Sequence, residues 1–126
     1  MKTLFVKIML LPISLLAACS SKSQQAIDFI PGTYVNHAQS AYSVADDTLQ
    51  IIPDVMTENS YHVIRKTAFR RILNGKLQPE EHQMKSFNGL WDEQKQILQL
   101  MQNGIILVFQ PDSNKMVIQN SPYRRL

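Results

Sequence analysis

The chain has 126 residues, of which 44% are hydrophobic and 18% are charged, and its formal net charge is +3. Without Lys2 and Lys7, 11 basic residues face 10 acidic ones and the net charge falls to about +1. Nucleic-acid binding usually requires a concentrated basic face, so this balance argues against a nucleic-acid partner. The length suits one domain with one core.

The first eighteen residues have the layout of a secretory signal. Lys2 and Lys7 supply positive charge, an apolar segment follows from Ile8 to Leu16, and two alanines precede the cysteine at position 19. The apolar segment is shorter than the roughly 20 residues of a membrane-spanning helix, and Pro12 interrupts it. We therefore expect residues 1–18 to be a signal peptide that is removed.

The sequence Leu16-Ala17-Ala18-Cys19 resembles the lipobox of bacterial lipoproteins. The resemblance implies cleavage between Ala18 and Cys19 and acylation of Cys19, with palmitate among the acyl groups, as the membrane anchor. An ordinary signal peptide, with Cys19 near the cut by chance, is the alternative. Ser20 follows the cysteine in place of a retention aspartate, and no acidic run comes after it. We therefore expect an outer-membrane lipoprotein that faces the periplasm.

Cys19 is the only cysteine. Once it is acylated, no thiol remains for a disulfide, a thiolate metal site or a cysteine nucleophile. Two or more acyl chains anchor a protein stably, whereas one binds only marginally. We expect residues 19–25 to be the lipidated cysteine and a flexible tether, and residues 26–126 to form a single β domain close to the membrane.

From residue 26 onward, short β-prone segments alternate with turn signals. The first strands are expected at Thr33–Val35, Thr48–Ile52 and Tyr61–Leu73. Asn74-Gly75 ends the third of these, and Asn-Gly is the strongest short hairpin signal because both residues tolerate positive φ. A helical turn is most expected at Val55–Ser60 or Pro79–Gln83.

The second half repeats this pattern more clearly. Strands are expected at Met84–Trp91, Ile97–Gln102, Ile105–Phe109, Lys115–Ile118 and Tyr123–Leu126. The run Ile105–Phe109 is apolar on both faces, which predicts a central or enclosed strand. Turn signals at this spacing predict an all-β fold, a small antiparallel meander that curls into a sheet or closes into a barrel. A helix over Asp92–Met101 is the competing prediction.

An aromatic cluster is the first candidate site. Phe87, Gly89 and Trp91 share one face of a strand, and with Phe109 they are candidates to line a pocket for an apolar or flat ligand. The alternative is that Phe87 and Trp91 form core and Gly89 marks a bulge or bend.

Two arginine pairs are the second candidate site. Arg70-Arg71 and Arg124-Arg125 each follow an aromatic residue and precede an aliphatic one. If the last strand lies near residues 69–72, the four guanidinium groups converge on a carboxylate, a phosphate or an acidic partner. Solvent exposure with local ion pairing is the alternative.

Catalytic and metal-binding motifs are absent from the sequence, so we expect no enzyme, no cofactor and no metal. The histidines do not have the spacing of a metal motif. A hydrolase built from scattered residues is the alternative, and its candidates are Asp46, Asp47, His62, Glu80, Glu81 and His82.

Beyond the lipobox, several segments resemble small lipoproteins encoded with conjugative elements of gut-type anaerobic bacteria: Pro31–Asn36, Phe69–Ile72 with Gly75–His82, and Tyr123–Arg125. Those proteins have no assigned chemistry, so the resemblance implies only a role at the envelope, supporting or limiting a transfer apparatus. The architecture also resembles lipocalin-like domains, in which the barrel mouth holds the ligand. With short strands, we expect side chains to fill the interior.

The leading hypothesis is a non-enzymatic outer-membrane lipoprotein. It predicts an interaction module, anchored to the membrane through Cys19, that binds an envelope protein. A small-ligand carrier of the lipocalin-like kind is the second hypothesis, and a hydrolase is the third.

Overall fold

The structure, a computed structural model, describes residues 24–126. The expected signal peptide, its cleavage point and Cys19 lie outside the described residues. The strands are β1 (Gly32–Gln39), β2 (Ser43–Pro53), β3 (Ser60–Leu73), β4 (Lys76–Leu77), β5 (Glu81–Asp92), β6 (Ile97–Leu100), β7 (Ile106–Gln110), β8 (Lys115–Ile118) and β9 (Ser121–Arg125). Residues 24–29 are helical, and a short 3-10 helix, η1, spans Pro111–Ser113.

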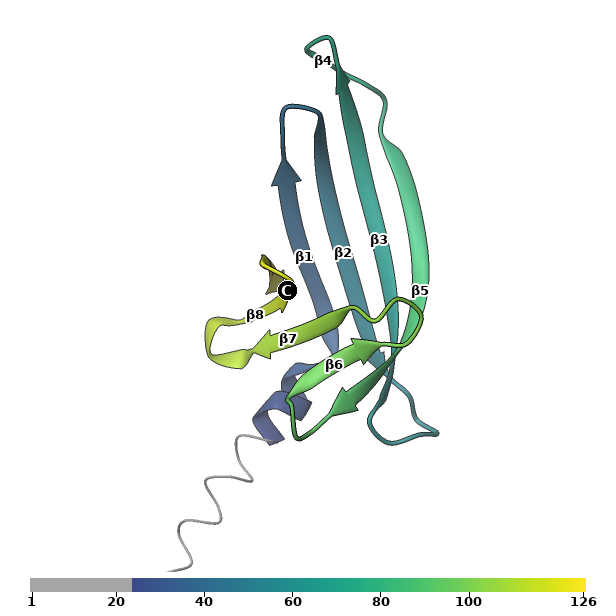
Figure 1. The fold of residues 1–126 in the computed structure, drawn as a ribbon, viewed down its shortest axis with the longest axis vertical. Helices are drawn as coiled ribbons and strands as arrows, with labels where there is room; N and C mark the ends of the chain where they lie inside the picture. The colour runs from purple at the N-terminus through teal and green to yellow at the C-terminus, as the bar shows by residue number, and fades with distance from the viewer. Residues whose placement is uncertain (1–23) are drawn as a thin grey trace, which may run out of the picture.

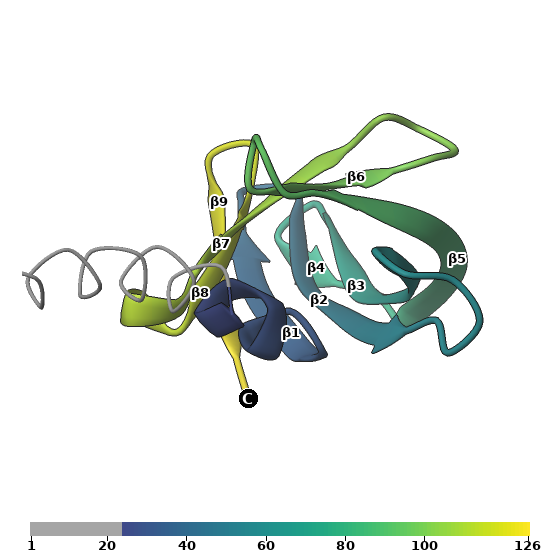
Figure 2. The ribbon, with the colours of Figure 1, turned by 90° about the horizontal axis from the view of Figure 1, so that it is seen from below.

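The strands form one antiparallel meander that closes on itself. With the exception of the short β4, each strand pairs with its neighbours along the chain, and β9 pairs with β1 to complete the ring. Figure 2 shows this ring from below. The all-β prediction is confirmed, and the closed barrel is the correct choice between the two architectures that the sequence left open.

The barrel interior is filled, as expected. Alternate residues of each strand point inward, so Leu49 and Ile51 of β2 meet Val63 of β3 and Leu107 of β7 in the core. Other buried residues of the same core are Tyr34, Tyr61, Trp91, Leu98, Leu100, Met116, Ile118 and Tyr123. Burial of these side chains supplies the main driving force for closing the barrel.

The helical residues 24–29 cover the lower end of the barrel (Figure 1). Ala26 and Ile30 are buried in the core. The hydroxyl of Tyr34 lies 2.6 Å from the Phe29 carbonyl oxygen and 2.9 Å from that of Ile30, so it caps the end of the helical segment. Residues 24 and 25, which we assigned to a flexible tether, belong to this helical segment. No helix within residues 24–126 has the length and apolar character needed to cross a membrane.

Four strands continue beyond the barrel as an open sheet. β9 pairs with β1 only at Tyr34 and Val35, and β6 pairs with β5 only from Gly89 to Asp92. Past these points β1, β2, β3 and β5 pair only with one another, and β4 adds a small hairpin at the tip. We call this part, residues 36–48 and 64–88, the extension (Figure 1).

Both expected helical turns were wrong, and the competing helix over residues 92–101 is absent. Residues 55–59 form bends and turns, and β5 already begins at Glu81, so neither predicted helical turn is present. The segment 92–101 is a hairpin, because the Asp92 carboxylate accepts hydrogen bonds from the backbone N–H groups of Gln94 and Lys95 and turns the chain before β6. β7 lies between β6 and β8 in the middle of the sheet, as predicted, although its outward-facing Ile106 is 43% exposed.

Candidate functional site

A buried acid lies at the mouth of the barrel, where the extension begins. Asp47 lies on the inner face of β2, on the same side of the strand as Leu49 and Ile51, and is 7% exposed. Its carboxylate accepts hydrogen bonds from Arg65 Nη2 at 2.6 Å, from Thr67 Oγ1 at 3.0 Å and from Tyr123 Oη at 2.6 Å. Arg65 Nη2 donates to Oδ2 and Arg65 Nε donates to Oδ1 at 3.1 Å, so the guanidinium and the carboxylate form a bidentate pair.

These contacts determine the charge of the cluster. Burial raises the pKa of Asp47, but hydrogen bonds from Arg65 and Tyr123 and the Arg65 charge outweigh it, and the pKa is lowered overall. The hydrogen bond to Asp47 raises the pKa of Arg65. Burial, followed by the bond to Asp47, raises the pKa of Tyr123 to about 12. At neutral pH the cluster therefore holds an ion pair and a neutral phenol.

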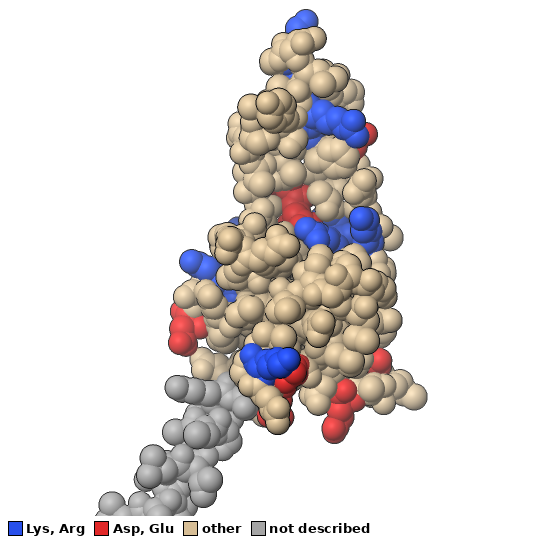
Figure 3. Space-filling model, viewed as in Figure 1, with Lys and Arg blue, Asp and Glu red and all other residues tan. Residues whose placement is uncertain are grey.

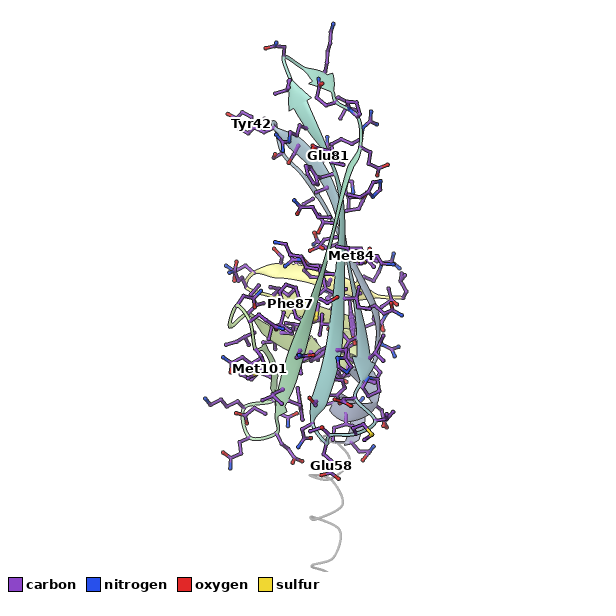
Figure 4. All side chains as sticks on the ribbon, turned by 90° about the vertical axis from the view of Figure 1, so that its right-hand side faces the viewer. Tyr42, Glu58, Glu81, Met84, Phe87 and Met101 are labelled. Atoms are coloured by element: carbon purple, nitrogen blue, oxygen red, sulfur yellow. The ribbon has the colours of Figure 1, made fainter. Side chains whose placement is uncertain are left out.

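Directly above this cluster is a pocket of about 320 Å³. It is lined by Arg65, Thr67, Gln83, Lys85 and Phe87 on the inner face of the extension, and by Asn103 and Ile105 between β6 and β7. We call it the mouth pocket. Figure 3 shows basic and acidic atoms together at this level, and Figure 4 places Phe87 at the base of the extension.

The mouth pocket combines free cationic donors with apolar surface. Arg65 uses Nε and Nη2 on Asp47, whereas Nη1 has no hydrogen-bond partner within residues 24–126. Over the same range, Lys85 Nζ forms no hydrogen bond and no ion pair. Phe87 and Ile105 supply the apolar part of the lining. Such a pocket suits an amphipathic anion.

The aromatic candidates separate into two groups. Phe87 lines the mouth pocket, but Trp91 is only 6% exposed and packs edge-on against Phe109 within the core, with ring centroids 6.2 Å apart. The space beside Gly89 is filled, because a Cβ there would stand 3.2 Å from Leu98 Cγ. Trp91 and Phe109 thus occupy core positions, and Gly89 makes room for Leu98 rather than for a ligand.

The two arginine pairs do not converge. β9 lies between β8 and β1, away from β3. Arg70 and Arg71 are near the tip of the extension, where Arg70 Nε donates to the Gln78 carbonyl oxygen at 2.9 Å and Arg71 pairs with Glu81 at 3.1 Å. The expectation of a four-arginine receptor was therefore wrong, because it required β9 to lie beside β3.

Arg124 and Arg125, the second pair, have different surroundings. Arg124 is exposed, whereas Arg125 is half-buried and contacts the helical segment. Arg125 Nε and Nη2 donate to the carbonyl oxygens of Phe29 and Pro31 at 3.1 and 2.8 Å, and its guanidinium lies 5.1 Å from the Phe29 ring. Arg125 is thus engaged in holding the lower end of the barrel closed.

The acids and histidines considered for hydrolysis are spread over the molecule. Asp46 pairs with His37 at 2.6 Å on the outer face, whereas Asp47 is inside the mouth. His62 is 3.7 Å from Asp54 near the other end of β3, and His82 is 3.7 Å from Glu80 within the extension. Within residues 24–126, no three His, Cys, Asp or Glu side chains stand close enough to hold a metal ion.

Sequence reasoning named Asp47 but did not connect it with Arg65, and it missed Thr67, Gln83 and Lys85. The spacing of Asp47, Leu49 and Ile51 is the signal that places the carboxylate on the inner face. No family model, curated protein or solved structure matches this chain at a significant level.

Proposed function

We propose that this chain is a lipid-anchored, non-enzymatic envelope protein whose barrel mouth binds a small amphipathic carboxylate. The observation that carries the proposal is the mouth pocket, which Lys85 and Arg65 line together with the apolar side chains of Phe87 and Ile105. The filled barrel below supports a site at the mouth rather than inside.

The charge of the pocket favours a monoanion. Arg65 is neutralised by Asp47, so Lys85 contributes the one uncompensated positive charge in the lining. The Arg65 Nη1 group adds a directional donor, and Gln83 and Asn103 add amides that orient an oxygen acceptor. The volume of about 320 Å³ is at the lower end of the range for small-molecule sites.

A binding role is favoured over catalysis by the state of Asp47. Its carboxylate already accepts hydrogen bonds from three side chains, and its lowered pKa makes it a weak proton acceptor. The same bonds fix the orientation of Arg65, which is the role that a supporting carboxylate has in a preorganised binding site.

The lipobox resemblance supports an anchor at Cys19. If the chain is anchored there, the fold determines which end of the barrel faces the membrane. The described chain begins at residue 24 beside the lower end of the barrel, whereas the extension is at the opposite end (Figure 1). The mouth pocket is lined by residues at the base of the extension. A membrane at the lower end would leave the mouth open to solutes and partners of the periplasm.

A second candidate function is the protein-interaction module at the outer membrane, with a transfer apparatus as the assembly it joins. It is favoured by apolar side chains that the extension exposes far from the barrel: Tyr42 is 80%, Leu73 57% and Leu77 52% exposed. Singly exposed apolar residues are common, but three at one tip form a contact surface suited to an envelope protein.

Binding is tested by calorimetry with phenylacetate and its neutral analogue phenylacetamide, on the full-length processed chain in nanodiscs. We expect phenylacetate to bind at least ten-fold more tightly and Lys85→Gln to remove this preference. Lys66→Gln is the matched control, because Lys66 is on β3 but exposed on the outer face. Equal binding of both compounds, or an equal effect of both substitutions, would refute the proposal.

The anchor is tested separately by growing cells with a clickable palmitate analogue. We expect the wild-type chain to incorporate label and to sediment with membranes, and Cys19→Ser to lose both properties. Label on the Cys19→Ser variant would contradict acylation at this position.

Crosslinking in intact cells, followed by identification of attached proteins, tests the second candidate function. Substitution of Tyr42 and Leu73 by serine should then abolish capture.

A further inference from the structure

We propose that the open edge of β5 binds an extended peptide by strand addition, and that an acidic side chain of this peptide enters the mouth pocket. This inference rests on the proposed function in one respect, the affinity of the pocket for a carboxylate. It adds the class of ligand, a β-strand of a partner protein, and it assigns recognition to main-chain groups.

The first observation is the direction of the β5 backbone groups. The Trp91 N–H donates to the Asn59 carbonyl oxygen at 2.7 Å, so odd-numbered residues of β5 bond toward β3. The Asn88 carbonyl oxygen accepts from the Met101 N–H at 2.8 Å, so even-numbered residues point the other way. By this alternation, the N–H and C=O groups of His82, Met84 and Ser86 point to the open edge.

The second observation is the position of this edge. β6 pairs with β5 only at Gly89–Asp92, and the chain then turns away through Asn103 to β7. Within residues 24–126, no strand continues the line of β6 beside residues 82–86. An incoming strand would therefore extend the existing sheet in the place that β6 leaves empty, directly beside the mouth pocket.

The opposite edge of the extension is less suitable. β1 is free of β9 only beyond Val35, and Asn36 Nδ2 donates to the Pro122 carbonyl oxygen at 2.7 Å. The uncovered part of β1 ends at Gln39, so it offers a shorter run than β5. Long, uncovered edges without proline or a bulge are the ones that accept another strand.

The third observation concerns which side chains the added strand meets. Gln83, Lys85 and Phe87 point to the inner face and line the mouth pocket, so side chains opposite them on the peptide point into that pocket. Met84 points to the outer face, is 68% exposed and provides an apolar neighbour there (Figure 4). The fitting peptide alternates an inward carboxylate with outward apolar residues.

Charge selects a partner strand over a second copy of this chain. An inward lysine on an edge strand disfavours pairing unless the incoming strand supplies an acid. Lys85 is such a residue, and it has no acidic partner within residues 24–126. Glu81, the acid on the inner face of β5 itself, is already paired with Arg71 at 3.1 Å. The occupant is therefore an acidic peptide.

The test is fluorescence polarisation with a labelled octapeptide that alternates valine and threonine and carries one central glutamate. The protein is the full-length processed chain in nanodiscs. We expect the peptide to bind, and we expect at least ten-fold weaker binding when alternate peptide nitrogens are methylated or when lysine replaces glutamate. Equal binding of the methylated peptide would overturn strand addition.

A second test changes the β5 edge of the protein instead of the peptide. Met84→Pro removes an N–H that points to the open edge, and prolines are tolerated at such positions. Met84→Ala is the control, because it removes the side chain and keeps the N–H. We expect at least a ten-fold loss for Met84→Pro alone. If that variant is unfolded by circular dichroism, the methylated peptide decides the outcome.

Competition separates this inference from the proposed function. We expect phenylacetate to displace the glutamate peptide, since both carboxylates occupy the mouth pocket. Phenylacetate binding without peptide binding would reject strand addition and leave the pocket assignment intact. Peptide binding that survives Lys85→Gln and is not displaced by phenylacetate would reject the carboxylate pocket.

Discussion

Tyr123 Oη lies 2.6 Å from Asp47 Oδ2, although the two residues are 76 positions apart in the chain. Tyr123 is on the last strand and Asp47 on the second, so the bond crosses the seam where β9 closes onto β1. Both groups are buried, and burial of a charge is tolerated only when it is paired and hydrogen-bonded. The contact therefore joins closure of the barrel to the polar cluster at its mouth.

The first prediction is that Tyr123→Phe destabilises the fold. It removes a hydrogen bond to a buried carboxylate, which costs about 1.5–3 kcal/mol of the free energy of unfolding. Urea denaturation followed by Trp91 fluorescence measures this loss. Tyr42→Phe makes the same chemical change at a residue that is 80% exposed and should leave the midpoint unchanged. Equal midpoints for all three proteins would show that the bond contributes nothing to closure.

The second prediction concerns acid. The folded pKa of Asp47 is below its value in the unfolded chain, so the unfolded state takes up the proton first as pH falls. The stability that Asp47 contributes is present above about pH 5 and is lost as pH falls through the folded pKa. Urea titrations from pH 7 to pH 2.5 on wild type and Asp47→Asn should therefore show a difference that shrinks in acid. A constant difference would contradict the lowered pKa.

The third prediction concerns alkali. Burial, the largest cause in both cases, raises the pKa values of Tyr34 and Tyr123 to about 12. Unfolded tyrosines ionise near pH 10, so their contribution to stability is complete below about pH 10 and is lost as pH rises toward 12. Ultraviolet titration at 295 nm should show Tyr34 and Tyr123 ionising near pH 12 in the folded chain, well above the pH at which unfolded tyrosines ionise. Titration of all four tyrosines near pH 10 in the folded chain would contradict this assignment.

The barrel was predictable to the extent that local signals determine it. Asn74-Gly75 and Asn103-Gly104 both stand at hairpins, and Gly75 and Gly104 have φ values of 76° and 70°. Alternation identified Leu49 and Ile51 as inward residues of β2 because both are apolar and buried. The extension was not foreseen, since hydrogen bonds to neighbouring strands, rather than an apolar stripe, maintain residues 81–86.

The polar cluster at the barrel mouth could not be predicted from local sequence patterns. Asp47, Arg65 and Tyr123 come from three strands, and their meeting depends on the register of β2 with β3 and on closure by β9. A shift of one residue in the register of β5 with β3 would turn Lys85 to the outer face. No pattern near Lys85 in the sequence distinguishes it from an ordinary exposed lysine.

The fourth prediction tests whether Gly89 serves packing. A Cβ at this position would meet Leu98 Cγ and Cδ1 at 3.2 Å and Leu100 Cδ2 at 3.5 Å. Gly89→Ala should therefore cost about 1–3 kcal/mol through overpacking. Adding Leu98→Ala frees that space, so the double variant should lose less stability than the sum of the single losses. A Gly89→Ala variant with normal stability but no phenylacetate binding would instead place Gly89 in the ligand site.

The fifth prediction separates Arg125 from its neighbour Arg124. The Arg125 guanidinium packs against Gly32, where a Cβ would come within 2.9 Å of Nε, and it donates to the carbonyl oxygens of Phe29 and Pro31. Arg125→Gln loses these charge-assisted bonds and should cost about 2 kcal/mol. Arg124→Gln makes the same change at an exposed residue and should stay within about 0.5 kcal/mol of wild type.

Hydrogen exchange shows whether the stability lost in Arg125→Gln is lost at the lower end of the barrel. The Ile30 N–H donates to the Ala26 carbonyl oxygen at 3.1 Å, so its exchange reports on the helical segment. Because Arg125 ties that segment to β9, Arg125→Gln should accelerate exchange at Ile30 more than at Leu107 in the core. If Arg125→Gln instead leaves stability and exchange unchanged and weakens capture of an envelope protein, Arg125 belongs to a partner-binding surface, as the arginine pairs first indicated.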